Sequence, residues 1–144
     1  MAMIDDLVFV DTNVLVYAYD ETERTRGPVA QRIVRDLWGS GRGVLSTQVL
    51  QEFYAVATKK IPKPLSRLTA RELVADFSQW SVVNTDPLLI VSASKLEEDH
   101  SLAWWDAHII SAALRSGAAT LLSEDLHHGR RFGRVTIRNP FLTR

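Results

Sequence analysis

Short apolar stretches alternate along the chain with longer segments of helical character. The first stretch, residues 7–10, is apolar at every position, which is typical of a parallel strand buried on both faces. The later stretches are shorter and are bounded by capping or turn residues. We expect strands at Leu7–Val10, Val44–Leu45, Val82–Val83 and Thr120–Leu122, with Val135–Ile137 as a fifth candidate.

The segments between these strands carry the start and stop signals of helices. Pro28 suits a first helical position, and Gly39 suits a helix end. Thr69 and Glu72 fit a capping box that begins another helix. The expected helices are Asn13–Tyr19, Pro28–Trp38, a helix from Ser46 or Thr47 to Lys59, one beginning at Thr69, one beginning at Pro87 and ending before Asp99, and Leu102–Ser116.

Strands that alternate with helices predict an α/β fold. We expect a three-layer sandwich with a mainly parallel central sheet of four to five strands, in a single domain that spans residues 1–144. In sheets of this kind, functional sites form at the carboxyl ends of the strands. Residues that directly follow a predicted strand are therefore the first candidates for chemistry.

Composition narrows the class of protein. The chain has 46% hydrophobic and 24% charged residues and no cysteine, which predicts an ordinary globular domain without disulfide or thiolate chemistry. No apolar run approaches the roughly 18 to 20 residues of a membrane span. The first six residues hold two acids and no basic residue, unlike a secretory signal. We therefore expect a cytoplasmic location and no membrane contact.

The formal charges balance, because 17 basic and 17 acidic residues give a net charge of 0. This balance argues against binding nucleic acid by bulk electrostatics. The basic residues are nevertheless concentrated in two stretches, either of which could contact a phosphate backbone or simply face solvent. The stretches are Lys59, Lys60, Lys63 and Arg67, and Arg130, Arg131, Arg134 and Arg138; the candidates for contact with a phosphate backbone are Lys59, Lys60, Arg130 and Arg131.

Four acids occupy positions that solubility alone explains poorly. Asp11 directly follows the first strand and Asp125 closely follows the fourth, although either could also cap a helix or turn. Asp106 lies in the middle of the apolar face of the helix predicted at 102–116, where a lone carboxylate would cost on the order of several kcal/mol unless it is paired or bound to a metal. Glu52 borders the apolar stripe of its helix, a position that surface glutamates often take.

These four acids can meet at the edge of the sheet formed by the carboxyl ends of the strands. Their mutual repulsion there would raise their pKa values unless a cation were bound. Oxygen ligands favour Mg²⁺ or Mn²⁺ as the cofactor over zinc. Such an ion activates a water and withdraws charge from a phosphoryl group, which predicts metal-dependent phosphate ester chemistry. Thr12, Asn13 and Ser123 could support the site by orienting Asp11 or a water, although Asn13 could also cap a helix and Ser123 could end its strand.

Four short segments resemble, in order, the acidic motifs of PIN-domain nucleases. The segments are Val10–Leu15, Thr47–Phe53, Trp105–Ala107 and Leu122–Leu126. The chain length and the closing segment Ser123–Gly129 are similar to the VapC toxins of bacterial and archaeal toxin–antitoxin pairs. The resemblance covers nearly the whole chain, and the ordered set is more specific than any one motif.

The resemblance implies an endoribonuclease that uses metal-activated water, forms a homodimer and is inhibited by a small antitoxin protein. Glu124 neighbours Asp125, and either could be the fourth acid; the motif register favours Asp125. The RNA that is cut and the number of metal ions stay open. The implied catalytic and metal-binding residues are Asp11, Glu52, Asp106 and Asp125, with support from Thr12, Asn13 and Ser123.

Several other polar and aromatic residues have simpler interpretations. Trp105 is expected in the core, whereas Trp104 is expected to point away from it, at an interface with a second subunit or an antitoxin. The adjacent His127 and His128 lack a fixed ligand geometry. We expect only solvating or structural roles for Asp5, Asp6, Asp20, His100 and His108.

Three rival functions follow from the same acids. A phosphohydrolase could use Asp11 as a covalent nucleophile, but such enzymes need a second acid two residues later, where this chain has Asn13. A receiver-like signalling module phosphorylated on Asp11 fits the order of the acids poorly. A catalytically silent RNA-binding scaffold has no need of four intact acids.

Overall fold

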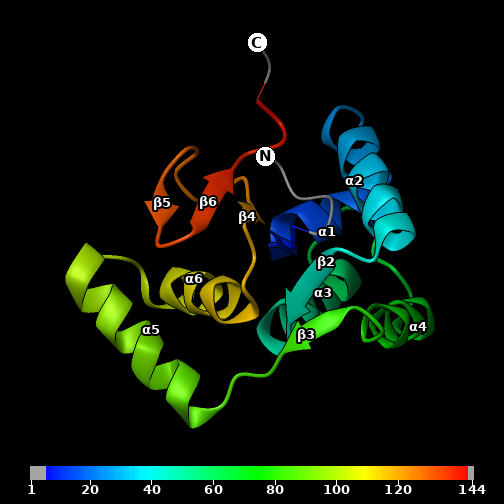
Figure 1. The fold of residues 1–144 in the computed structure, drawn as a ribbon. Helices are drawn as coiled ribbons and strands as arrows, with labels where there is room; N and C mark the ends of the chain where they lie inside the picture. Colours follow the sequence, from blue (N-terminus) through cyan, green and yellow to red (C-terminus); the bar gives the residue numbers. More distant parts are fainter. Residues whose placement is uncertain (1–5, 143–144) are drawn as a thin grey trace.

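The computed structural model describes residues 6–142, and every strand expected from the sequence is present (Figure 1). The elements are β1 (Val8–Val10), α1 (Thr12–Tyr19), α2 (Arg26–Ser40), β2 (Gly43–Ser46), α3 (Thr47–Lys59), α4 (Arg67–Phe77), β3 (Ser81–Val83), α5 (Pro87–His100), α6 (Trp104–Ser116), β4 (Thr120–Leu122), β5 (Arg131–Phe132) and β6 (Val135–Arg138).

The strands form one six-stranded sheet in the order β3-β2-β1-β4-β6-β5. Neighbours from β3 to β6 run parallel, and β5 pairs antiparallel with β6. The chain moves outward from β1 to β2 and β3 and then crosses back to β4, on the other side of β1. With right-handed crossovers, this reversal places the connecting helices on opposite faces of the sheet.

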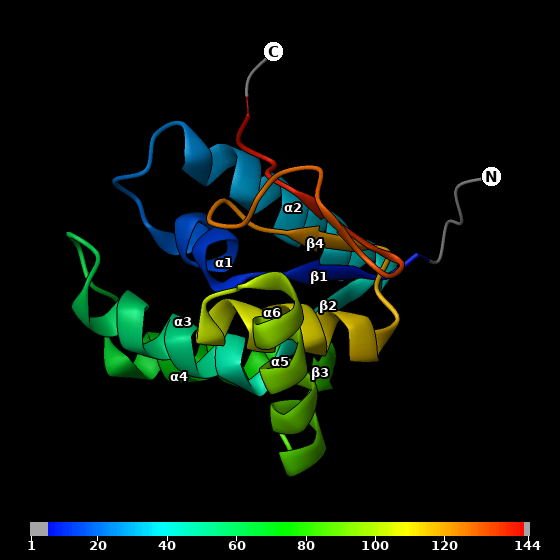
Figure 2. The same ribbon diagram turned by 90° about the vertical axis from the view of Figure 1, so that its left-hand side faces the viewer.

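Helices cover both faces of the sheet. In Figure 1, α1 to α4 lie on one side of the strands, and α5 and α6 lie on the other. The helix α1 packs against α2 and α3, while α6 contacts β2, β3 and β4. Figure 2 shows α5 projecting from the body of the domain. The prediction of an α/β fold with a mainly parallel central sheet is confirmed.

The core explains why β1 is apolar throughout. Phe9 and Val10 are fully buried because helices cover both faces of the strand. On the side of α1 to α4, Phe53 and Phe77 are also fully buried and meet Tyr19 edge to face. Burial of each such aromatic side chain contributes on the order of 2 kcal/mol or more. None of the helices within residues 6–142 is long and apolar enough to cross a membrane.

The number of strands and the start of α4 differ from the prediction. The sheet has six strands rather than four to five, because the two-residue β5 is too short to produce an apolar pattern. Gly133, with a φ of 57°, supplies the left-handed turn that lets β5 pair with β6. The capping box at Thr69 was placed three residues late: Ser66 caps α4, and its Oγ accepts a hydrogen bond from the Thr69 N–H at 3.0 Å.

Gly43 of β2 lies directly beneath the indole ring of Trp80, which a Cβ at this position would overlap. We expect Gly43→Ala to lower the free energy of unfolding by about 1 to 3 kcal/mol, the usual cost of overpacking. Gly39→Ala is the matched control, because nothing lies within 4 Å of the added Cβ in α2, and it should gain about 0.5 to 1 kcal/mol. Urea unfolding measures both changes. A Gly43→Ala protein as stable as the wild type would contradict this packing.

Candidate active site

The carboxyl ends of β1 and β4 lie side by side and position the first acid. Asp11 follows β1 and donates its backbone N–H to the carbonyl of Leu122, the last residue of β4, at 2.9 Å. Its carboxylate accepts hydrogen bonds from Ser123 Oγ at 2.8 Å and from the Thr12 N–H at 2.7 Å. Asp11 therefore caps α1 and contacts the loop after β4 at the same time.

Asp11 is a buried carboxylate, with 8% of the residue exposed. Burial is the main reason that the pKa of Asp11 rises from 3.8 to about 6. The hydrogen bonds from Ser123 and Thr12 oppose this rise in pKa, and the negative charges of Glu52 and Asp125 add to it. Ionised Asp11 is thus costly in the metal-free protein, and a nearby cation would reduce that cost.

Asn13 and Ser123 fix the loop after β4. Asn13 Nδ2 donates to Asp125 Oδ2 at 3.0 Å, and Asn13 Oδ1 accepts from the Glu124 N–H at 3.1 Å. The fully buried Ser123 accepts a hydrogen bond at Oγ from the Asp125 N–H at 3.2 Å. The two side chains therefore set the position of Asp125 relative to Asp11.

Glu52 and Asp106 approach the same edge of the sheet from opposite faces. Glu52 is exposed on α3 and accepts a hydrogen bond from Thr12 Oγ1 at 3.3 Å. Asp106 is half-buried in the first turn of α6. Burial raises the pKa of Asp106, and the charge of Asp125 raises it further. Hydrogen bonds and mutual repulsion thus connect the four acids in one cluster.

Glu124 turns toward α1 and α2 instead. Its carboxylate accepts a hydrogen bond from Tyr17 Oη at 2.5 Å and forms an ion pair with Arg26 Nε. Burial raises the pKa of Glu124, but the bonds to Tyr17 and Arg26 lower it, and the net shift is downward. Burial, followed by the bond to Glu124, raises the pKa of Tyr17 to about 12. Glu124 is therefore occupied outside the acid cluster, whereas Asp125 is part of it.

The donors in the cluster are oxygens, which suit Mg²⁺ or Mn²⁺. Within residues 6–142, no three acidic or histidine side chains are close enough to hold one ion together. Mg²⁺ is commonly held by one or two carboxylates, while waters and substrate phosphates complete its shell. The cluster fits an ion held in this open way rather than in a closed protein cage.

Comparison with known families identifies the domain. The model of the PIN domain family matches residues 8–134, a range that includes all four acids. This chain belongs to the PIN domain family. Among curated proteins, no sequence match was found.

Two solved structures share the fold of this PIN domain. VapC20 of Mycobacterium tuberculosis, described as a toxin that cleaves the sarcin–ricin loop, matches with a TM-score of 0.59 and 20% identity, over 79% of this chain and 86% of that one. VapBC2 of Rickettsia felis, solved with a DNA fragment from their promoter, matches with a TM-score of 0.65 and 16% identity, over 92% of this chain and 98% of that one. At these identities the likeness concerns the fold.

The basic residues predicted to contact RNA lie on the two segments of this PIN domain that carry Glu52 and Asp125. Lys59 ends α3, the helix that carries Glu52, and Lys60 follows it. Arg130 and Arg131 belong to the segment after Asp125, where the guanidinium of Arg130 lies 4.6 Å from the ring centroid of Phe132. All four basic side chains are exposed. Their contact with RNA stays a prediction.

The two tryptophans reverse their predicted positions. Trp105, expected in the core, is 64% exposed. Trp104, expected to point outward, is half-buried, and its ring centroid lies 4.2 Å from that of His108. The cause is the start of α6, which begins at Trp104 rather than at Leu102. Helical side chains lean toward the N-terminus, and Trp105 is in the first turn of α6, so no earlier turn of that helix lies under its side chain.

Two acids also differ from prediction. Asp106 was expected in the middle of an apolar face, but in the first turn of α6 it is only half-buried, and Asp11 is the more buried acid. Asp20 was expected to be solvated; it is 7% exposed and accepts a hydrogen bond from Thr22 Oγ1 at 2.6 Å. Asp5 lies outside the described residues.

Tyr17 and Arg26, which hold Glu124, were not among the residues predicted from the sequence. Tyr17 lies four residues after Asn13 on α1, so both side chains share the helix face that meets the loop after β4. That spacing is a signal that could have identified Tyr17. Nothing in the sequence pairs Arg26 with an acid 98 residues later.

Proposed function

We propose that this PIN domain is an endoribonuclease that depends on Mg²⁺ or Mn²⁺ and acts as the toxin of a toxin–antitoxin pair. The observation that carries the proposal is the Asp11 carboxylate, buried among other acids with a pKa of about 6. A bound cation would relieve both the burial and the repulsion. The fold shared with VapC20, described as a toxin that cleaves the sarcin–ricin loop, supports RNA as the substrate. A cytoplasmic location is part of the same proposal.

Each residue of the cluster has a role in this proposal. Of Asp11, Glu52, Asp106 and Asp125, one or two would bind the ion directly, and the others would contact waters bound to it. When bound, the ion supplies a water of lowered pKa and withdraws charge from the phosphoryl oxygens. Thr12 and Ser123 orient Asp11, and Asn13 orients Asp125. Hydrolysis adds water to phosphorus and breaks the bond to O3′, so the products carry a 5′-phosphate and a 3′-hydroxyl.

The phosphohydrolase alternative has less support from the same contacts. Both oxygens of Asp11 accept hydrogen bonds, which leaves its carboxylate poorly prepared for nucleophilic attack. Asn13, at the position where such enzymes carry an acid, is committed to the loop that holds Asp125. We therefore retain water as the nucleophile.

The experiment that tests the proposal is cleavage of a structured RNA pool in Mg²⁺, Mn²⁺ or EDTA. Wild-type protein is compared with Asp106→Asn and with Asp99→Asn, an exposed acid on α5 that serves as the matched control. Cleavage that needs metal, is lost in Asp106→Asn and is kept in Asp99→Asn supports the nuclease. Equal cleavage by wild type and Asp106→Asn, or cleavage that survives EDTA, would overturn it.

The pair Glu124 and Asp125 offers a separate prediction. We expect Asp125→Asn to reduce metal-dependent cleavage by at least about 100-fold, since several kcal/mol of transition-state stabilisation depends on the ion. Glu124→Gln should stay within a few-fold of wild type, because Glu124 faces Tyr17 and Arg26. Initial rates on one RNA measure both variants. The reverse order of activities would make Glu124 the fourth acid.

The proposed partners are a small antitoxin and a second copy of the chain. The shared fold with VapBC2, solved with a DNA fragment from their promoter, supports a partner of the first kind. Leu88 and Val91, 72% and 65% exposed, form an apolar face on α5 that a homodimer would cover. We expect light scattering to report a dimer for wild type and a monomer for Val91→Glu. A monomeric wild type at micromolar concentration would contradict the homodimer.

A further inference from the structure

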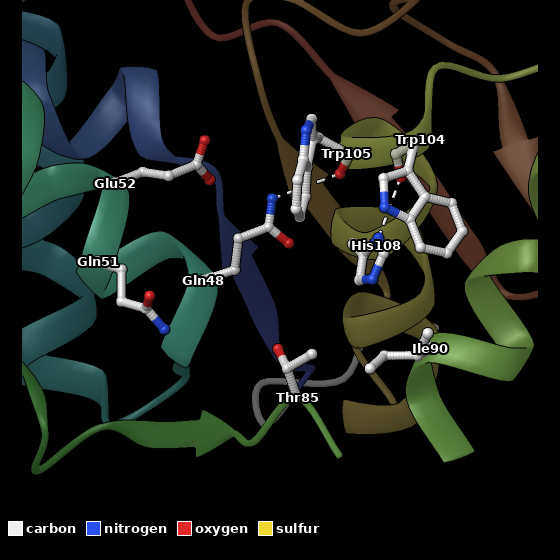
Figure 3. Close-up of a pocket in the computed structure, with 8 residues that line it drawn as sticks. All are labelled: Gln48, Gln51, Glu52, Thr85, Ile90, Trp104, Trp105 and His108. Carbon is white, nitrogen blue, oxygen red and sulfur yellow. Dashed lines mark hydrogen bonds between the residues drawn. The ribbon is translucent and has the colours of Figure 1, made fainter. Parts of the chain in front are cut away.

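A groove of about 500 Å³ opens beside the acid cluster (Figure 3). One wall belongs to α3, and the opposite wall belongs to α5, α6 and the segment before α5. Side chains of mixed character line the groove: Gln48, Gln51, Glu52, Thr85, Ile90, Trp104, Trp105 and His108. The proposed nuclease chemistry gives no role to any of these residues except Glu52.

Aromatic rings form the α6 wall of this groove. Trp105 is 64% exposed and stands between Gln48 and the other rings in Figure 3. Its centroid lies 5.3 Å from that of His108 and 6.5 Å from that of Trp104. An exposed indole supported by neighbouring rings presents a rigid apolar surface on which a planar ligand can stack.

Neutral polar groups complete the groove. Gln48 Nε2 donates to the Trp105 carbonyl at 3.4 Å, which connects the two walls. Gln51 is exposed on α3. His108 is 4% exposed and donates from Nδ1 to the Trp104 carbonyl at 3.1 Å, which fixes the orientation of its ring in the groove lining. Amides and an imidazole are groups that pair with the edges of nucleobases.

The charged side chains that line the groove determine which ligands it can bind. Its lining includes one carboxylate, Glu52, and no lysine or arginine. A phosphate group would be repelled there, whereas a neutral, flat, hydrogen-bonding ring would not be.

Glu52 joins the groove to the acid cluster. It lines the groove and also accepts the hydrogen bond from Thr12, the neighbour of Asp11. A group seated against Trp105 would therefore lie next to the site where the phosphodiester is cleaved. Unpaired bases of RNA have the planarity, polarity and connection to a phosphate that this placement requires.

We propose that the groove is a base-binding subsite, in which Trp105 stacks on an unpaired base of the RNA substrate and Gln48 and Gln51 bind the edge of that base. The subsite selects the position at which the RNA is cut, and this inference rests on the proposed nuclease function. Trp105, Gln48 and Gln51 are thus specificity-determining residues rather than ligands of the ion.

The first arm of the test measures binding. Dye-labelled hexamers of uridine, cytidine or adenosine, and an abasic hexamer with the same phosphates, are titrated in Mg²⁺ by fluorescence anisotropy. The Asp106→Asn background prevents cleavage. We expect at least one base-bearing hexamer to bind more tightly than the abasic one, and Trp105→Ala to weaken that binding roughly tenfold, as for loss of one stacked base. Trp105→Tyr should retain most of the affinity, and Leu68→Ala on α4, at a residue that is 58% exposed, is the matched control.

The second arm measures cleavage in the otherwise wild-type protein. Trp105→Ala and Gln51→Ala should raise KM more than they lower kcat and should change the preferred cut positions. Unchanged affinity, KM and cut positions in Trp105→Ala would overturn the subsite and leave the nuclease intact. Base-dependent binding without any wild-type cleavage would overturn the nuclease and leave the groove as a base site. A change in oligomeric state in Trp105→Ala, with RNA affinity unchanged, would make the groove a protein interface and overturn the inference.

Discussion

Replacing Asp11 with Asn is expected to reduce metal-dependent RNA cleavage about a thousandfold and, in the same variant, to make the metal-free protein more stable. The loss follows because the ion contributes about 4 kcal/mol to transition-state stabilisation and Asp11 would be its most buried ligand. The gain follows because an amide avoids the cost of ionising a group whose pKa is raised to about 6. Cleavage rates and urea unfolding in EDTA measure the two effects.

The expected loss of activity together with a gain in stability distinguishes a functional carboxylate at Asp11 from a structural one. Asn caps helices about as well as Asp, so the capping bond to Thr12 survives the change. A variant that loses both activity and stability would mean that Asp11 is a structural cap, and one that keeps activity would remove Asp11 from the site. Asp99→Asn, on the exposed surface of α5, controls for the loss of one charge and should change neither quantity.

The stability of the metal-free protein should also depend on pH through Asp11. Between pH 3.8 and about 6 the folded protein binds a proton at Asp11 that the unfolded chain has released. The free energy of unfolding therefore falls as pH rises through this window, by about 3 kcal/mol for a pKa raised from 3.8 to about 6. Below pH 3.8 Asp11 is protonated in both the folded and the unfolded protein, and above about pH 6 it is ionised in both. Asp11 therefore does not change the unfolding free energy with pH outside this window.

The pH dependence of stability includes contributions from the other acids of the protein. The contribution of Asp11 is therefore measured as the difference in unfolding free energy between wild type and Asp11→Asn. The free energy of unfolding in EDTA is determined for wild type and Asp11→Asn from pH 3.5 to pH 8. The advantage of the variant should grow from near zero to about 3 kcal/mol and then level off. Saturating Mg²⁺ should reduce this advantage, because the ion stabilises the folded wild type. A difference that does not change with pH would contradict the raised pKa of Asp11.

The regular elements could be predicted from sequence where local signals were strong. The apolar run of β1, the glycine after α6 and the proline that begins α5 each gave the right element within a few residues. The two-residue β5 could not be found, because so short a segment has no periodicity. The start of α4 was misplaced because both Ser66 and Thr69 suit a cap, and only the folded backbone selects one.

Topology predicts that the acids lie close together, but it does not predict how deeply each one is buried. Asp11 and Asp125 follow from the rule that parallel strands gather their carboxyl ends at one edge. The larger burial of Asp11, compared with Asp106, depends on where α6 begins and on Ser123, which comes 112 residues after Asp11 in the sequence. The groove depends on side chains of α3, α5 and α6 whose proximity has no periodic signature.

The pairing of β1 with β4 also affects when the protein can act during its own synthesis. Asp11, Glu52 and Asp106 leave the ribosome before Ser123 and Asp125, which complete the acid cluster. Until β4 emerges and pairs with β1, Ser123 cannot reach Asp11 and Asn13 cannot hold Asp125. A nascent chain that ends before this point would lack the complete acid cluster, so under the proposed nuclease function it could not attack the ribosome or the message during that part of its synthesis.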